Sequence, residues 1–224
     1  MDFKVVSVDS FIIYFGDFID EKIALEIKKA YFCIKKLNLE GIIEIIPSYT
    51  SIFITFDIFK YDFEILKDLI KQNINLQIDE NFEEKIVEID VYYGTEVGFD
   101  LEYLSSKTTL SIEEIIKIHS NKLYDVYAIG FLPGFAYLAK VDEKIAFPRL
   151  STPRKIVPKG SVAIADFQTA IYPQQSPGGW NIIGKTAFEL FDKKLETLSP
   201  LNVGNKVKFN SISKEEFLVQ GGVL

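Results

Sequence analysis

The chain has 224 residues, of which 48% are hydrophobic and 14% aromatic, and its formal net charge is -7. This composition excludes disorder caused by low hydrophobicity, and the acidic balance argues against non-specific nucleic-acid binding. A single cysteine, Cys33, excludes an internal disulfide. The N-terminus lacks the basic and apolar regions of a signal peptide, and no apolar run approaches the ~18 residues that span a bilayer. We therefore expect a cytoplasmic protein without a membrane partner.

Glycine and proline are unevenly distributed along the chain. Residues 1–85 contain one of the 8 prolines and two of the 13 glycines. The stretch QIDENFEEK at 77–85 is polar enough for a linker. We therefore predict two domains, residues 1–85 and residues 86–224.

The first domain is predicted to mix strands and helices. Six segments have the residue patterns of regular elements, in chain order strands at 3–8 and 11–15, a helix at 20–38, strands at 42–46 and 51–57, and a helix at 61–72. The order ββαββα predicts an α+β domain with its helices on one side of an antiparallel sheet.

The second domain is predicted to be mainly β. It begins with an alternating apolar and polar run at 87–93, and two short helices follow. The second helix opens with a capping box, in which Glu114 lies three residues after Ser111. Later strand-like runs, separated by glycine and proline, lie at 124–131, 161–167, 169–173, 180–184, 188–192, 206–210 and 217–220. Many short strands with such punctuation indicate a β-barrel or a sandwich.

The only arginines of the chain lie five positions apart. Arg149 and Arg154 each follow a proline, and they are two of 25 basic residues. A guanidinium binds carboxylates, carbonyls or phosphates through two parallel hydrogen bonds, so we interpret this choice as a sign of ligand or interface recognition. In a regular strand the two side chains would point to opposite faces. Both reach one pocket only if residues 151–153 turn or bulge.

Proline and glycine are concentrated around these arginines. The segments are GFLPGFAYL at 130–138, FPRLSTPRKIVPKGSVAIA at 147–165, and SPGGWNIIGKT at 176–186. Rigid, sharply turned loops of this kind can hold polar groups beside a ligand and expose backbone N–H groups to an oxyanion. The alternative interpretation is that they are turns between barrel strands, with their aromatic residues in the core.

Other candidate residues have two interpretations each. His119, near the end of a predicted helix, is either a surface histidine favoured by the helix dipole or a general base. Trp180 either stacks on a ligand or caps the barrel. Asp142 and Asp166 are general bases or, more simply, loop residues.

The sequence predicts no metal site and no complete catalytic triad. One histidine and one cysteine cannot supply the usual nitrogen and sulfur ligands of a metal. Ser176 does not lie in a nucleophile elbow, and neither type of glycine-rich phosphate loop is present. No ATP site is therefore evident in this chain.

Several motifs occur in an order and spacing found in a known family. They include GFLPGFAYL, the run from Pro148 to Ser161, QTAIYP and SPGGWNIIGKT, with YYGTEVGFDL at 92–101 among the earlier matches. On these motifs the chain resembles the family of the 5-oxoprolinase subunit PxpB, KipI and allophanate hydrolase subunit 1, over essentially its whole length. The resemblance implies an N-terminal α/β domain and a C-terminal cyclophilin-like β-barrel.

The resemblance also implies a function. It suggests a PxpB-like subunit of an ATP-dependent 5-oxoprolinase, inactive alone, which opens 5-oxoproline to glutamate together with PxpC-like and PxpA-like subunits. Two alternatives remain open. One is a KipI-like inhibitor of a sporulation histidine kinase, with Phe131 and Phe135 exposed at its interface. The other is half of a biotin-dependent carboxyltransferase of the urea and allophanate pathway.

We expect this chain to contribute half of a substrate site at an interface between subunits. Arg149 and Arg154 would orient an anionic or carbonyl group, with His119 as a third catalytic candidate. Backbone amides at Gly178 and Gly179 would stabilise an oxyanion. The complete set of expected substrate-binding residues is Phe131, Pro133, Gln168, Tyr172, Ser176, Gly178, Gly179 and Trp180.

Three positions depart from the family pattern. Asp166 and Ala170 replace glycines that we expect where the backbone approaches a ligand closely. Lys185 stands where arginine is common, which removes a possible forked contact. With both glycines replaced, the resemblance does not fix the identity of the substrate.

Overall fold

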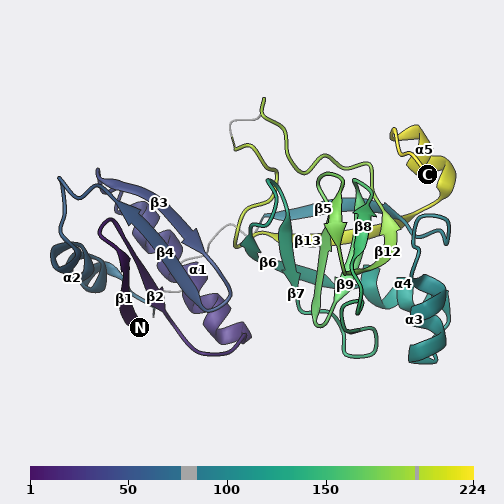
Figure 1. Cartoon of the computed structure of the whole chain (residues 1–224), viewed down its shortest axis with the longest axis horizontal. Coiled ribbons are helices and arrows are strands. Elements are labelled where there is room, and N and C mark those ends of the chain that lie inside the picture. The colour runs from purple at the N-terminus through teal and green to yellow at the C-terminus, as the bar shows by residue number, and fades with distance from the viewer. Residues whose placement is uncertain (77–84, 195–196) are drawn as a thin grey trace. The chain divides into compact units, whose positions relative to one another are not determined.

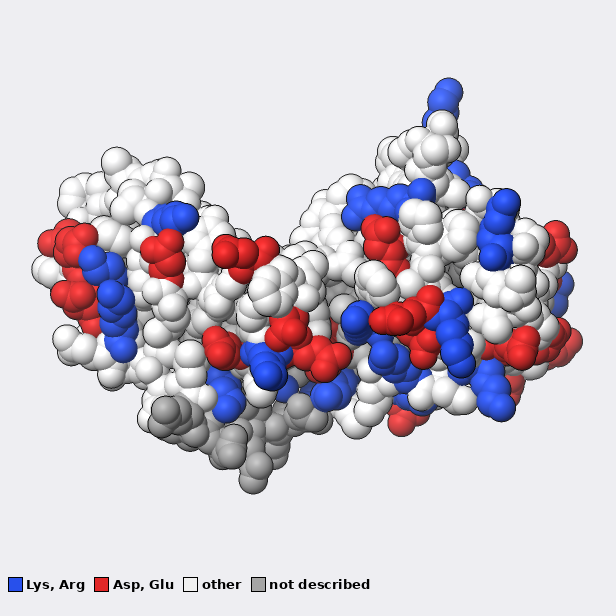
Figure 2. All heavy atoms as spheres, turned by 90° about the horizontal axis from the view of Figure 1, so that it is seen from below, with Lys and Arg blue, Asp and Glu red and all other residues white. Residues whose placement is uncertain are grey.

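The computed structural model describes residues 1–76, 85–194 and 197–224, and the chain divides into two compact units, residues 1–82 and 83–224. Figure 1 shows both units, each of which is described by itself. Within the described ranges, no helix is both long enough and apolar enough to cross a membrane. On the face drawn in Figure 2, basic and acidic side chains are interspersed rather than gathered in a patch of one sign.

The first unit is a four-stranded antiparallel sheet, in the order β1-β2-β4-β3, with two helices. Its elements in chain order are β1 (Asp2–Ser7), β2 (Ser10–Tyr14), α1 (Glu21–Lys36), β3 (Ile42–Pro47), β4 (Ser51–Phe56) and α2 (Phe63–Asn73). Alternate residues of β4, including Ile52 and Ile54, are buried because successive side chains of a strand point to opposite faces. They form one apolar cluster with Ile27 and Ile34 of α1 and Leu66 of α2.

Side-chain caps set the starts of both helices in this unit. Asp20 accepts a hydrogen bond from the backbone N–H of Lys22 at 2.8 Å, and Asp62 accepts one from that of Ile65 at 2.9 Å. These bonds satisfy N–H groups that have no partner inside a helix. The helices therefore begin one or two residues later than the sequence predicts.

The second unit contains a closed barrel of seven strands in the order β10-β7-β6-β13-β5-β12-β9. Its elements are β5 (Ile86–Tyr92), α3 (Leu101–Thr108), α4 (Ile112–Ser120), β6 (Leu123–Ile129), β7 (Ala136–Ala139), β8 (Arg154–Val157), β9 (Ser161–Ala165), β10 (Gln168–Ile171), β11 (Ser176–Gly178), β12 (Asn181–Lys185), β13 (Lys206–Ile212) and α5 (Lys214–Val219). Strand β13 runs parallel to β5, and the other neighbours in the barrel are antiparallel. The predicted mainly-β barrel is thus confirmed, while its likeness to cyclophilin stays a prediction.

Apolar side chains fill the barrel. Ile89 of β5, Leu138 of β7, Ile164 of β9 and Phe209 of β13 are each at most 1% exposed and belong to one cluster. The capping box predicted for Ser111 and Glu114 opens α4, which lies with α3 beside the barrel in Figure 1.

Two strand predictions in this unit are wrong. Residues 217–220 fall in and just after α5, which opens with a second capping box formed by Ser213 and Glu216. Phe217 is buried, and it lies on one face of the helix α5 rather than in a strand. Residues 188–192 form neither strand nor helix. Such short apolar runs carry too few periods to distinguish a strand from a helix or an extended loop.

Candidate functional site

A second apolar cluster covers the outer side of the barrel at β9, β10 and β12. Every residue of β9 is buried, because Val162 and Ile164 join the barrel core while Ala163 and Ala165 pack in this outer cluster. Its buried members are Phe135, Val157, Ala163, Ala165, Ala170, Tyr172, Trp180 and Ile182. The small alanines leave room for the aromatic rings. The loops of the predicted site therefore lie on this packed cluster, which we call the floor of the site.

A two-stranded ribbon, made of β8 and β11, contributes to this cluster. Arg154 pairs with Gly178 in the ribbon, and Val157 pairs with Ser176. A Cβ atom on Gly178 would overlap the hydroxyl and ring of Tyr172, whose Cζ would lie 2.8 Å away. Glycine is therefore required at position 178 for the ribbon to lie this close to the floor.

The loop that carries Arg149 is anchored on both sides of that residue. Asn181, which is fully buried on β12, donates from its side-chain nitrogen to the carbonyl oxygen of Pro148 at 2.9 Å. The backbone N–H of Leu150 donates to the carbonyl oxygen of Gly179 at 2.8 Å. Both anchors are on the segment at 176–186. The segment that carries the arginines and this glycine-rich segment therefore fold against each other.

The anchored loop places the exposed Arg149 over the indole of Trp180. The guanidinium carbon lies 5.6 Å from the centre of the ring, within the range of a cation–π contact. Trp180 is 5% exposed, and its ring packs edge-to-face on Phe135 at 5.8 Å. A guanidinium that stacks on an aromatic face keeps the N–H groups at its edge for a carboxylate or carbonyl.

Arg154 is held by a carboxylate that the sequence analysis missed. Its Nη2 atom lies 2.6 Å from Oδ1 of Asp100, which is 4% exposed. The other carboxylate oxygen accepts a hydrogen bond from the backbone N–H of Ile182 at 2.6 Å. Asp100 lies within the motif at 92–101, and no local pattern in the sequence pairs it with Arg154.

Both arginines lie at the outer cluster, Arg149 over Trp180 and Arg154 opposite Gly178, which packs on Tyr172. Ser151 and Thr152 form a bend between them, so the alternation of a regular strand does not apply. Burial raises the pKa of Tyr172, and the positive charges of both Arg149 and Arg154 oppose that rise.

His119 is neither a surface histidine nor placed as a general base. It is fully buried, its ring stacks on Phe209 at 4.7 Å, and both ring nitrogens have partners. Because Thr169 donates its hydroxyl to the carbonyl of Ala163, His119 Nε2–H donates to Thr169 at 2.9 Å and Nδ1 accepts from Tyr93 at 2.8 Å. These bonds give His119 a structural role inside the barrel.

Burial of His119 predicts a pH-dependent stability. Burial lowers the pKa of His119 to about 3, whereas the unfolded residue titrates near its ordinary value of 6.5. At a pH between these two values, the unfolded chain therefore binds a proton at His119, whereas the folded barrel does not. The contribution of the neutral His119 to the free energy of unfolding is complete above pH 6.5. It is lost as the pH falls towards 3, by at most about 1.4 kcal/mol per pH unit.

Urea unfolding at pH 6.5 and pH 5, followed through the single tryptophan in the barrel unit, measures this slope. We expect the free energy of unfolding to fall over this interval in the native chain and to change less in His119→Gln. Equal slopes in the two proteins would show that another group accounts for the pH dependence.

The remaining residues of the predicted site differ in their exposure. Phe131 is 62% exposed, has a φ of 71°, and packs its ring edge-to-face on Phe135 at 5.3 Å. Pro133, two residues later, is also exposed. Ser176 is buried and donates to the carbonyl of Pro177 at 3.2 Å, while Gln168 is half-buried at the start of β10. Phe135 is 1% exposed, which corrects the expectation that it lies on an interface surface.

The candidate bases and the departures from the family pattern have structural explanations. Asp142 caps a turn by accepting from the backbone N–H of Lys144 at 2.9 Å. Asp166 is exposed at the hairpin between β9 and β10 with a φ of 51°, which glycine and aspartate tolerate. Ala170 is fully buried in the outer cluster. A positive φ at 166 and close packing at 170 are structural reasons for the residues found there, and the expected approach of the backbone to a ligand stays a prediction.

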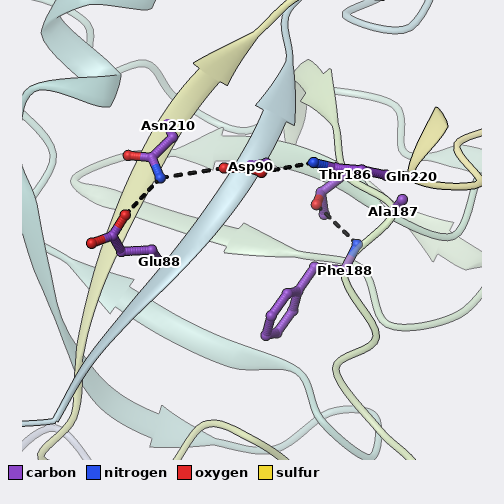
Figure 3. A pocket seen from close by; sticks show the side chains of 7 residues that line it. All are labelled: Glu88, Asp90, Thr186, Ala187, Phe188, Asn210 and Gln220. Atoms are coloured by element: carbon purple, nitrogen blue, oxygen red, sulfur yellow. Dashed lines mark hydrogen bonds between the residues drawn. The ribbon is translucent and has the colours of Figure 1, made fainter. Parts of the chain in front are cut away.

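A hollow of about 410 Å³ lies elsewhere on the barrel unit (Figure 3). It is lined by Glu88, Asp90, Thr186, Ala187, Phe188, Asn210 and Gln220. Asn210 donates to Glu88 at 2.9 Å and to Asp90 at 3.3 Å, and Gln220 donates to Asp90 at 2.8 Å. None of the predicted site residues lines this hollow. In the described parts of the chain, no group of three or more His, Cys, Asp or Glu is placed to hold a metal ion.

Comparison with known proteins places the chain in a family. The sequence profile described as "Carboxyltransferase domain, subdomain C and D" matches residues 1–201. The B subunit of 5-oxoprolinase from Bacillus subtilis is 39% identical over 217 residues, which are 92% of this chain and 90% of that protein.

Solved structures agree with this assignment. The crystal structure of TTHA0988 is 32% identical and superposes with a TM-score of 0.82 over 92% of this chain, which spans only 40% of that protein. The urea carboxylase of Kluyveromyces lactis shares the fold, with a TM-score of 0.73 at 18% identity, over 94% of this chain and 22% of that one. This chain therefore belongs to the family of carboxyltransferase domains, subdomains C and D, together with the B subunits of 5-oxoprolinase.

Proposed function

We propose that this chain is a subunit of a heteromeric, ATP-dependent 5-oxoprolinase. Its similarity to the B subunit from Bacillus subtilis over nearly the full length of both chains supports this assignment. The observation that carries it is the exposed guanidinium of Arg149, held over Trp180 by a loop that is anchored at Pro148 and Leu150. Such a group suits a small substrate that bears a carboxylate and a carbonyl.

In the proposed reaction the complex opens the cyclic amide of 5-oxoproline. Water supplies a hydroxyl to the carbonyl carbon and a proton to the nitrogen, the C–N bond breaks, and glutamate forms with hydrolysis of ATP. Arg149 would bind the carboxylate or the carbonyl oxygen, and Arg154 would add its charge on the same side. Backbone amides at Gly178 and Gly179 would stabilise the developing oxyanion. Tyr172 and Trp180 would form the floor of the site.

The rest of the site would come from other subunits. PxpC-like and PxpA-like partners would complete the lactam site and supply the ATP site. In this proposal the barrel domain, residues 86–224, carries the substrate-binding loops, and residues 1–85 form a separate domain. The exposed Phe131 would lie at or near the contact with a partner.

Co-purification of this chain with PxpC-like and PxpA-like subunits, followed by an assay of 5-oxoproline-dependent ATP hydrolysis, tests the proposal. We expect turnover only when all subunits are present. A stable complex that hydrolyses no ATP with 5-oxoproline would contradict the proposed substrate and favour another amide or carboxyl transfer. Failure to form any complex, with tight binding of a histidine kinase instead, would favour the KipI-like role.

A further inference from the structure

Asp100 is mounted rigidly on the wall of the barrel. Its backbone N–H donates to the carbonyl of Ile182 at 2.9 Å, and its side-chain Oδ2 accepts from the N–H of the same residue at 2.6 Å. Two residues earlier, the chain approaches β12 so closely that a Cβ on Gly98 would lie 2.6 Å from the carbonyl oxygen of Ile183. Little freedom is left for the Asp100 carboxylate to move relative to β12.

The second oxygen of this carboxylate holds the ribbon of β8 and β11. It lies 2.6 Å from Nη2 of Arg154, and the side chains of Asp100 and Arg154 are 6% and 28% exposed respectively, so water screens the pair only in part. Arg154 is paired with Gly178 across the ribbon and lies five residues after Arg149. Through one ion pair the barrel wall is therefore linked to both motifs of the proposed site.

The two arginines differ in what they offer to a ligand. The Nη2 atom of Arg154 is engaged by Asp100, and its Nη1 atom is buried without a hydrogen-bond partner among the described residues. Arg149 is exposed. We propose that Asp100 is a positioning residue, which acts through Arg154 to fix the ribbon and the Arg149 loop, while Arg149 makes the contact with substrate. The catalytic part of this inference rests on the proposed function.

Asparagine at position 100 would break the link without changing the size of the side chain. If its oxygen accepts from the N–H of Ile182, its NH₂ group faces Nη2 of Arg154, and two donors then oppose each other. Loss of the partner also leaves a partly buried guanidinium without a counter-charge, which is costly. The ribbon should therefore be released from the barrel wall.

Asp100→Asn in the assembled complex should lower kcat/KM for 5-oxoproline by about 10²-fold, the usual effect of a misplacement near 1 Å. Asp90→Asn is the matched control, because Asp90 also accepts hydrogen bonds from two side chains, Asn210 of β13 and Gln220 at the end of α5, and neither partner is an arginine. The double variant Asp100→Asn with Arg154→Lys should be no worse than the poorer single variant. Effects that multiply would contradict an action through Arg154.

Hydrogen exchange of the isolated full chain tests the positioning role independently of turnover. Amides of the ribbon, residues 154–157 and 176–178, should exchange faster in Asp100→Asn than in the native chain or in Asp90→Asn. If Asp100→Asn does not fold, Arg154→Lys provides the same test from the other side of the pair. Unchanged exchange in the ribbon would overturn the inference. Absence of lactam turnover by the native complex would instead reject the proposed function, and the exchange result would still decide this point.

Discussion

Replacing Arg149 with lysine in the assembled complex should lower kcat/KM for 5-oxoproline by about 10²-fold, the typical effect of removing one well-placed hydrogen-bond donor. Lysine keeps the positive charge but loses the planar fork and the stacking surface that guanidinium presents to Trp180. The side chain is exposed, so the melting temperature should change little. Steady-state kinetics of ATP hydrolysis, with thermal unfolding measured in parallel, checks both expectations.

Lys155→Ala is the matched control for this variant, because Lys155 is an exposed cation on the same ribbon. Its turnover should stay close to that of the native complex. An Arg149→Lys complex that retains full ATP-coupled turnover would show that a general positive charge is sufficient and that the fork of Arg149 binds no substrate group.

Replacing Gly178 with alanine should disrupt the ribbon, whereas the same change at Gly179 should be tolerated. A Cβ at 178 would overlap the hydroxyl of Tyr172 and lie 2.8 and 2.9 Å from two atoms of its ring. Tyr172 is 1% exposed and packs edge-to-face on Phe135, so its ring has little room to move. A Cβ at 179 would find its nearest neighbour, Pro153, at an ordinary 3.5 Å.

We expect Gly178→Ala to cost about 1–3 kcal/mol of unfolding free energy, as overpacking of a core usually does. Activity in the complex should fall further than this loss of stability explains, because the ribbon carries Arg154. Tyr172→Phe should rescue the variant only in part, since it removes the hydroxyl but leaves the ring carbons in place. Equal unfolding free energies for Gly178→Ala and Gly179→Ala would refute the packing argument.

Local patterns in the sequence predict much of this fold. The alternation that buries Ile52 and Ile54 in β4 is visible as a strand, and the capping box of Ser111 and Glu114 marks the start of α4. The same signal, at Ser213 and Glu216, also marks α5. The apolar run at 217–220 obscures that signal, because on its own it suggests a strand.

Features that depend on contacts distant in sequence could not be predicted. The parallel pairing of β13 with β5 joins segments more than a hundred residues apart. His119 resembles a surface residue near a helix end, yet α4 places it among Tyr93, Thr169 and Phe209, where both ring nitrogens are used. Only the tertiary structure shows that this histidine serves stability.

The candidate site shows the same division. The rarity of arginine and the clustering of proline and glycine single out the segments at 147–154 and 176–181, and the structure shows that these two segments are joined by hydrogen bonds. The partner of Arg154 lies 54 residues away at Asp100 and has no local signature. The anchoring role of Asn181 likewise depends on its burial beneath Pro148.

Hydrogen exchange of the assembled complex, with and without 5-oxoproline, tests most directly whether these loops form part of a lactam site. We expect slower exchange on binding in peptides that cover residues 147–154 and 176–180, and no change around the hollow lined by Glu88 and Asp90. Unchanged exchange in both loop segments, in a complex that does bind or turn over 5-oxoproline, would contradict the assignment and place the lactam site outside these loops.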